Sequence, residues 1–145
     1  MNNYNKIFEK ELLIKSVTDS LAEVREFTKS AANECGFPEE TSGKIMLAVD
    51  EACTNIIKHA YKFSPEGNIL ITIKFKESKL VISITDEGMH FDPEKVPEPN
   101  LREYYKQKRV GGLGMYLIKK LMDEVNYSTL SGSKNQVVLV KYLSN

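Results

Sequence analysis

The chain has 145 residues, a length that predicts one domain with its own hydrophobic core. Its 20 basic residues balance its 20 acidic ones, which argues against a protein built mainly to hold nucleic acid. No apolar run approaches the ~20 residues of a membrane span, and residues 1–15 contain no apolar secretory segment. We therefore expect a cytoplasmic protein that contacts neither membrane nor nucleic acid directly. The two isolated cysteines, Cys35 and Cys53, match no metal-binding spacing, and we expect reduced thiols.

Hydrophobic periodicity predicts secondary structure over most of the chain. In chain order the predicted elements are a strand at 10–17, a helix at 20–35, a helix at 39–62, strands at 68–75 and 79–86, a helix at 113–125, and strands at 125–131 and 136–142. Asp19 or Ser20 would cap the first helix, and Gly36 would end it. A short turn at 76–78 joins two alternating segments, which predicts an antiparallel hairpin. The fold class is therefore α/β: a two-layer α/β sandwich whose mixed, mostly antiparallel sheet is covered on one face by helices.

Three glycines, Gly111, Gly112 and Gly114, stand where the third helix must begin. Glycine is about 1 kcal/mol worse than alanine inside a helix, so this cluster needs a reason. The preceding segment, 87–112, has no clear period and exceeds the ~12–15 residues beyond which loops are usually functional. Its basic side chains are those of Arg102, Lys106, Lys108 and Arg109. Basic residues beside the backbone N–H groups of a helix start favour an anion site, although a solvated surface loop with a permissive turn fits the same pattern.

The second helix carries a line of polar residues along one margin of its apolar face. Glu51, Asn55 and His59 follow one another at i+4 steps. A carboxylate one turn from an amide oxygen can serve as a base beside a ligand for Mg²⁺, which takes few protein ligands and leaves the rest to water and phosphate. Alternatively Glu51 is solvated, Asn55 bonds to a loop, and His59 packs or caps the helix. Asp50 is a competing base, but it points about 100° away from Glu51, on the side away from Asn55.

Asp86 closes the second strand of the predicted hairpin. It continues the parity of Leu80, Ile82 and Ile84, so its side chain should point to the helix-covered face. A buried carboxylate there needs hydrogen-bond donors, and the amino group of adenine is one that fits. Gly88 just behind it would let a ligand approach the backbone closely. The alternative is an ordinary turn that ends the strand.

Taken together, the three stretches resemble the motifs of the GHKL ATPase superfamily. DEACTNIIKHAY (50–61) looks like its N-box, DEGMHFDP (86–93) like its G1 box, and RVGGLGMYLIKKLMDEV (109–125) like its G2 box. The details resemble one branch, the anti-sigma factor serine/threonine kinases of bacteria, over about residues 8–142. The resemblance implies a single histidine-kinase-like ATP-binding domain over residues 1–145, with the Bergerat-type fold and an ATP lid at about 92–112.

The resemblance also implies roles for individual residues in a site for ATP or ADP with Mg²⁺. Glu51 would be the general base, Asn55 would hold Mg²⁺, and Asp86 would bind the adenine amino group. Gly88 would admit the base. The remaining residues implied in nucleotide binding are Phe91, Arg109, Gly111, Gly112, Leu113 and Gly114. Among these, the glycines at the helix start would present N–H groups to the phosphates, and the arginine would reach the outer phosphates.

The implied partners are proteins. The resemblance implies an anti-sigma factor that sequesters a sigma factor, phosphorylates a serine or threonine of an anti-anti-sigma factor of the STAS fold, and forms a homodimer. An alternative function is a nucleotide-gated partner-binding regulator with little or no kinase activity. A detached histidine-kinase catalytic domain is a third hypothesis, although the only two histidines, His59 and His90, both lie inside the ATP-binding motifs.

Two positions depart from the superfamily pattern. His90 stands where many members have the second glycine of the G1 box, and it would either line the pocket entrance or face solvent. The last strand, QVVLVKY (136–142), has no Thr or Ser where the superfamily often uses one near the adenine. This chain therefore lacks the Thr or Ser that, by the resemblance, would take part in water-mediated recognition of adenine.

Overall fold

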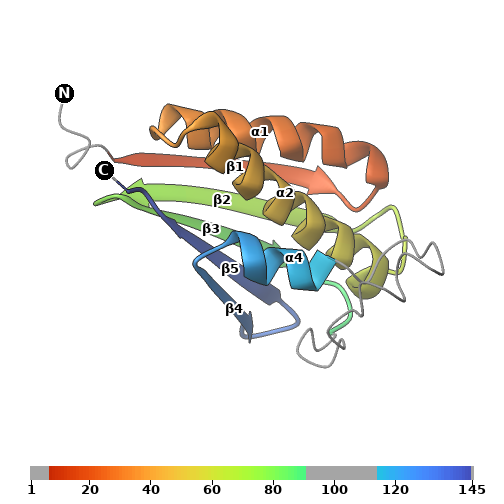
Figure 1. The fold of residues 1–145 in the computed structure, drawn as a ribbon. Helices are drawn as coiled ribbons and strands as arrows, with labels where there is room; N and C mark the ends of the chain where they lie inside the picture. Colours follow the sequence, from red (N-terminus) through yellow and green to blue (C-terminus); the bar gives the residue numbers. More distant parts are fainter. Residues whose placement is uncertain (1–6, 91–113, 145) are drawn as a thin grey trace.

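A computed structural model describes residues 7–90 and 114–144 of the chain (Figure 1). Its main elements are β1 (Phe8–Lys15), α1 (Leu21–Glu34), α2 (Glu39–Asn55), β2 (Asn68–Lys76), β3 (Lys79–Asp86), α4 (Gly114–Leu121), β4 (Glu124–Thr129) and β5 (Asn135–Tyr142). A 3-10 turn, Thr18–Ser20, precedes α1, and a π-helical turn, Ile56–Ala60, continues α2.

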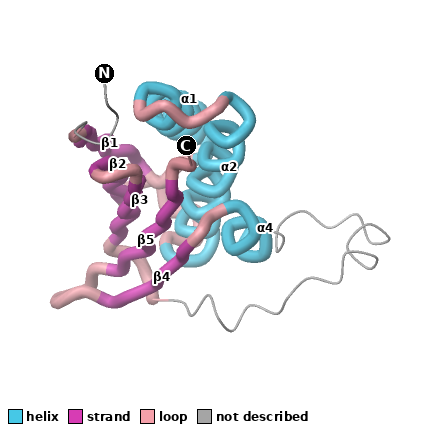
Figure 2. The backbone as a smooth tube through the Cα atoms, turned by 60° about the vertical axis from the view of Figure 1, so that its left-hand side comes forward, coloured by secondary structure: helices cyan, strands magenta, loops and turns pink. Residues whose placement is uncertain are grey.

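The five strands form one sheet in the order β1-β2-β3-β5-β4. All four pairings between the described strands are antiparallel, so the expectation of a mixed sheet is corrected to an antiparallel one. The helices lie on one face, as Figure 2 shows with the sheet seen from its edge. The predicted two-layer α/β sandwich is therefore confirmed.

The core lies between α2 and the helix-facing side of the sheet. Alternation in the strands sends every second side chain inward, and Ile71, Ile84 and Val137 form one such row across three strands. The apolar face of α2 and of the π turn that continues it is buried at each position: Ile45, Val49, Ala52, Cys53, Ile56 and Ala60. Each fully buried side chain of Val, Leu or Ile contributes about 1.5–3 kcal/mol. Both cysteines are buried and free, as expected.

The first two helices begin and end close to the predicted residues. Ser20 is the N-cap of α1, but its side chain makes no capping hydrogen bond. Gly36 ends the helix with φ of 100°, a conformation that favours glycine. The second helix is α-helical only to Asn55 and continues as a π turn to Ala60, two residues short of the predicted end at 62. The N–H of Tyr61 donates to the carbonyl of Ile56, five residues back, so the last turn is widened into a π turn.

The third helix also ends earlier than its periodicity predicts. It stops at Leu121 instead of residue 125, because the N–H of Asp123 already donates to the carbonyl of Val140 in β5 at 2.9 Å. This bond draws the chain into the sheet, and Val125 pairs with Leu139 as part of β4. The apolar residue that fits the helical period is thus a strand residue.

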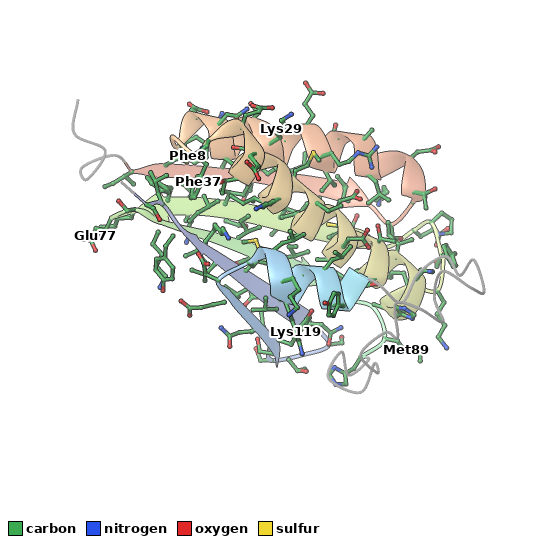
Figure 3. The ribbon with its side chains drawn as sticks, viewed as in Figure 1. Phe8, Lys29, Phe37, Glu77, Met89 and Lys119 are labelled. Carbon is green, nitrogen blue, oxygen red and sulfur yellow. The ribbon has the colours of Figure 1, made fainter. Side chains whose placement is uncertain are left out.

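The two ends of the molecule differ. Figure 3 shows Glu77, at the tip of the β2–β3 hairpin, at one end and Met89 at the other. The end with Met89 is where α2 finishes and β3 delivers Asp86, and it holds the candidate site. No helix among the described residues is long and apolar enough to cross a membrane.

Candidate nucleotide-binding site

Asp86 is the buried carboxylate at the centre of the site. It is 4% exposed and continues the inward-facing row of β3, as predicted. Its Oδ1 atom accepts hydrogen bonds from the N–H of Gly88 at 2.9 Å and from Nδ2 of Asn135 at 3.1 Å. Its Oδ2 atom accepts none from the described residues, which leaves one acceptor oxygen for a ligand.

The charge state of Asp86 reflects two opposed effects. Burial raises the pKa of the carboxyl because it disfavours the ionised form. The hydrogen bonds from Asn135 and Gly88, together with the nearby His90, act to lower the same pKa. A buried acceptor of this kind fits an adenine amino group, which brings a hydrogen-bond donor without a charge.

Gly88 lies against the π turn that follows α2. A Cβ atom at this position would lie 2.7 Å from both the carbonyl carbon and the oxygen of Ala60, so no side chain fits. The next residue, Met89, donates its N–H to the same oxygen at 2.7 Å. Gly88 therefore permits the close approach of the backbone of Ala60. Its expected role in admitting the adenine base stays a prediction.

Tyr61 is a residue of the site that the sequence reasoning missed. Its hydroxyl donates to the carbonyl of Asn68 at 2.6 Å and accepts the N–H of Glu87 at 2.8 Å. Its ring fills the space where a side chain at Gly67 would lie. The sequence did contain a hint of this role, because Tyr61 is an aromatic residue with a hydroxyl that lies between the end of a predicted helix and a glycine. Tyr61 ties the start of β2 to the residue that follows Asp86.

Glu51 and Asp50 have different surroundings although they are adjacent. Asp50 is bound to Arg25, with Oδ1 3.1 Å from Nη1, and its side chain is 16% exposed. Glu51 is half-buried and receives no hydrogen bond from the described residues. Burial raises the pKa of Glu51, the negative charge of Asp50 raises it further, and Lys58 acts to lower it. Glu51 is therefore a stronger base than an exposed carboxylate. Unlike Asp50, it is not held in an ion pair with Arg25.

Asn55 is the last residue of α2 and is buried, one α-helical turn after Glu51. The π turn begins directly behind it, so the regular i+4 series does not continue to His59. His59 is exposed, and partial burial followed by the charge of Lys58 lowers its pKa. The expected alignment of three polar residues is thus correct for the first pair and wrong for His59.

His90 lies at the rim of the site. It is exposed, and its Nδ1 atom is 3.4 Å from both Oδ1 of Asn135 and Oγ1 of Thr129. His90 therefore faces solvent, which was one of the two alternatives. The other, that it lines the pocket entrance, stays a prediction.

Asn135 is the second residue that the sequence reasoning missed. It is the first residue of β5 and pairs directly with Asp86 across the sheet. The two strands are far apart in the chain, so no local pattern reveals this pairing. The register of the hairpin 68–86 is readable from the sequence, but the strand that follows it in space is not.

The remaining predicted site residues fall in the predicted lid and at the start of the third helix. Phe91, Arg109, Gly111, Gly112, Leu113 and the lid at 92–112 lie outside the described residues. Gly114 begins α4, which runs beside α2 (Figure 1), and Ile118 of this helix is fully buried. The described residues contain no cluster of three or more carboxylate, histidine or cysteine ligands, so a metal here would depend on Asn55, water and phosphate oxygens.

Comparison with known proteins defines the class. Residues 14–141 match the histidine kinase-like ATPase domain, and the chain belongs to this family, whose domains bind ATP. The histidine kinase domain of a blue-light activated histidine kinase from Erythrobacter litoralis has a similar structure, with a TM-score of 0.55. That match is 20% identical and covers 87% of this chain and 60% of the other, so it supports a shared fold and nothing more.

Three sequence relatives are serine-protein kinases named RsbW. The serine-protein kinase RsbW of Listeria monocytogenes is 35% identical over 117 residues, which cover 78% of this chain and 73% of that protein. RsbW of Oceanobacillus iheyensis is 31% identical over 99% of this chain and 90% of its own length. RsbW of Bacillus thuringiensis is 33% identical over 99% of this chain and 88% of its own length. The family and branch predicted from the three motifs are confirmed.

Proposed function

We propose that this protein is an ATP-dependent protein serine/threonine kinase that also acts as an anti-sigma factor. It phosphorylates a serine or threonine of an anti-anti-sigma factor of the STAS fold, and it sequesters a sigma factor until that partner competes. It works as a homodimer in the cytoplasm. The observation that best supports the kinase assignment is the environment of Glu51. This carboxylate is half-buried, has a raised pKa and lies one helical turn before Asn55. It is not part of the ion pair that Asp50 forms with Arg25.

The nucleotide binds across the end of the molecule where α2 and β3 meet. Asp86 accepts a hydrogen bond from the adenine amino group through Oδ2, the oxygen that no described residue uses. Asn55 would hold Mg²⁺, which would neutralise charge on the phosphate oxygens. Gly112 and Gly114 present backbone N–H groups to the phosphates, and Arg109 neutralises the outer ones.

Phosphoryl transfer then needs positioning and one proton acceptor. The hydroxyl oxygen of the partner's serine attacks the γ-phosphorus, and its proton passes to a carboxylate oxygen of Glu51. The bond from the γ-phosphorus to the bridging oxygen breaks, and ADP leaves with the bonding electrons. The raised pKa of Glu51 suits this step, because a base works best when its pKa approaches the working pH.

The test uses the whole chain with a STAS protein encoded by the same organism. The two are incubated with Mg²⁺ and ATP labelled at the γ-phosphate, and the partner is analysed by mass spectrometry. We expect one phosphoserine or phosphothreonine on the partner and none in reactions without ATP. Partner capture that depends on ATP without any phosphoprotein would contradict the kinase assignment and support a nucleotide-gated binding protein instead.

A further inference from the structure

Asn135 links the carboxylate of Asp86 to the backbone behind it. The two residues face each other across the antiparallel pair of β3 and β5. The single Nδ2 atom of Asn135 donates to Oδ1 of Asp86 at 3.1 Å and to the carbonyl oxygen of Gly88 at 3.0 Å. One amide group therefore fixes the side chain of Asp86 relative to the segment that follows it.

This contact decides which oxygen of Asp86 is available. Oδ1 is occupied twice, by Asn135 and by the N–H of Gly88, while Oδ2 has no donor among the described residues. A carboxylate held by one oxygen cannot turn freely about its last bond, so the second oxygen points in one direction. A ligand that meets this oxygen must bring a donor at a fixed place.

The same contact acts on the protonation of Asp86. A protonated carboxyl would present a donor in place of an acceptor, and it would then suit a purine with an oxygen at position 6. Burial pushes the pKa of Asp86 upward, and the hydrogen bond from Asn135 is the first of the effects that oppose it. The other groups near Asp86 are His90, whose charge acts in the same direction as Asn135, and Tyr61, whose own pKa the negative Asp86 helps to raise.

We propose that Asn135 is a positioning residue that sets the base specificity of the site, by orienting Asp86 so that its Oδ2 atom accepts a hydrogen bond from the 6-amino group of adenine. The inference rests on the proposed binding of adenine by Asp86. It adds that a residue on a different strand, outside the three motifs, decides between a 6-amino and a 6-oxo purine. A purely structural Asn135 would change affinity for both bases alike.

The test compares ADP with inosine diphosphate, which carries a 6-oxo group, by titration calorimetry on the full chain. The wild-type protein should bind ADP at least about tenfold more tightly, as expected for a hydrogen bond to a charged group. Asn135→Ala should weaken ADP binding by about tenfold and inosine diphosphate binding by much less, so that the preference falls to about threefold or lower. Asn135→Ser repeats the comparison with a smaller change if the alanine variant unfolds.

The matched control is Gln136→Ala. Gln136 is the next residue of β5 and faces the other side of the sheet, where its side chain donates to Oγ1 of Thr85 at 3.3 Å. This variant should keep the wild-type preference. An Asn135 variant that binds both nucleotides with an unchanged ratio overturns the role of Asn135 alone. A wild-type protein that binds neither nucleotide overturns the proposed function, and the inference with it.

Discussion

Gly88 and Ala60 are in backbone contact, and this contact joins the two parts of the proposed nucleotide site. A side chain at position 88 would overlap the carbonyl group of Ala60, which also accepts the N–H of Met89. Ala60 ends the π turn behind the helix of Glu51, whereas Gly88 follows Asp86 by two residues. This backbone contact therefore fixes the position of Glu51, the proposed base, relative to Asp86, the proposed adenine-binding carboxylate.

Gly88→Ala tests this contact. The added methyl group must displace backbone, so we expect a loss of about 1–3 kcal/mol in the free energy of unfolding and weaker ADP binding. Gly43→Ala in α2 is the control, because nothing lies within 4 Å of a Cβ atom there. It should stabilise the protein by up to about 1 kcal/mol through helix propensity. Chemical denaturation measures both, and a Gly88→Ala protein as stable as the wild type contradicts the contact.

Tyr61→Phe tests the second link between the helix end and Asp86. The change removes one hydroxyl that serves two backbone groups, those of Asn68 and Glu87. We expect a loss of about 1–2 kcal/mol in unfolding free energy and a measurable loss of ADP affinity. Tyr142→Phe is the control, since the hydroxyl of Tyr142 donates to the side chain of the exposed Glu124 and should matter little. Equal effects of the two substitutions would argue against a role for Tyr61.

The pH dependence of phosphate transfer should report Glu51. Its ionised form is the base, and burial raises its pKa, so the rate should fall as the pH drops through a value above the ordinary carboxyl range. Asp50→Asn removes a neighbouring negative charge and should move this inflection to lower pH. Lys58→Met removes a positive charge and should move it to higher pH. Single-turnover rates across the pH range give the inflections, and shifts of the same sign in both variants would exclude Glu51 as the titrating group.

The tip of the β2–β3 hairpin offers a stability prediction far from the site. Glu77 and Ser78 have φ of 53° and 62°, a left-handed conformation that favours Asn and Gly in two-residue hairpin turns. Replacing the pair by Asn-Gly should raise the free energy of unfolding by about 1–2 kcal/mol. ADP binding should not change, because the tip lies at the end of the molecule opposite Met89 (Figure 3). Thermal or chemical denaturation with parallel calorimetry checks both statements.

The parts of this fold that were predictable depend on local patterns. Strict alternation in 68–86 predicted the hairpin, the inward row and the burial of Asp86, because strand parity is a property of neighbouring residues. The i+4 spacing of Glu51 and Asn55 was predictable for the same reason. The π turn was not, because it accompanies the contact of Ala60 with a segment almost thirty residues later, a distance that no helical period contains.

The early end of α4 and the role of Asn135 have a common cause. Both depend on where β5 lies in the sheet, since β5 pairs with its sequence neighbour β4 on one side and with β3, a distant strand in the chain, on the other. The hydrogen bond of Asp123 to Val140 ends the helix, and the register of Asp86 with Asn135 completes the site. Strand order is fixed by packing of the whole domain, so these features appear only in three dimensions.

The central claim is that Glu51 is the general base of a serine kinase, and the rate of single-turnover phosphate transfer from ATP to the STAS partner tests it most directly. Glu51→Gln keeps the size of the side chain and removes the base, whereas Asp50→Asn leaves Glu51 in place. The account predicts that Glu51→Gln binds ADP like the wild type but transfers phosphate at least about 100-fold more slowly, while Asp50→Asn retains transfer. Transfer by Glu51→Gln at the wild-type rate would contradict it.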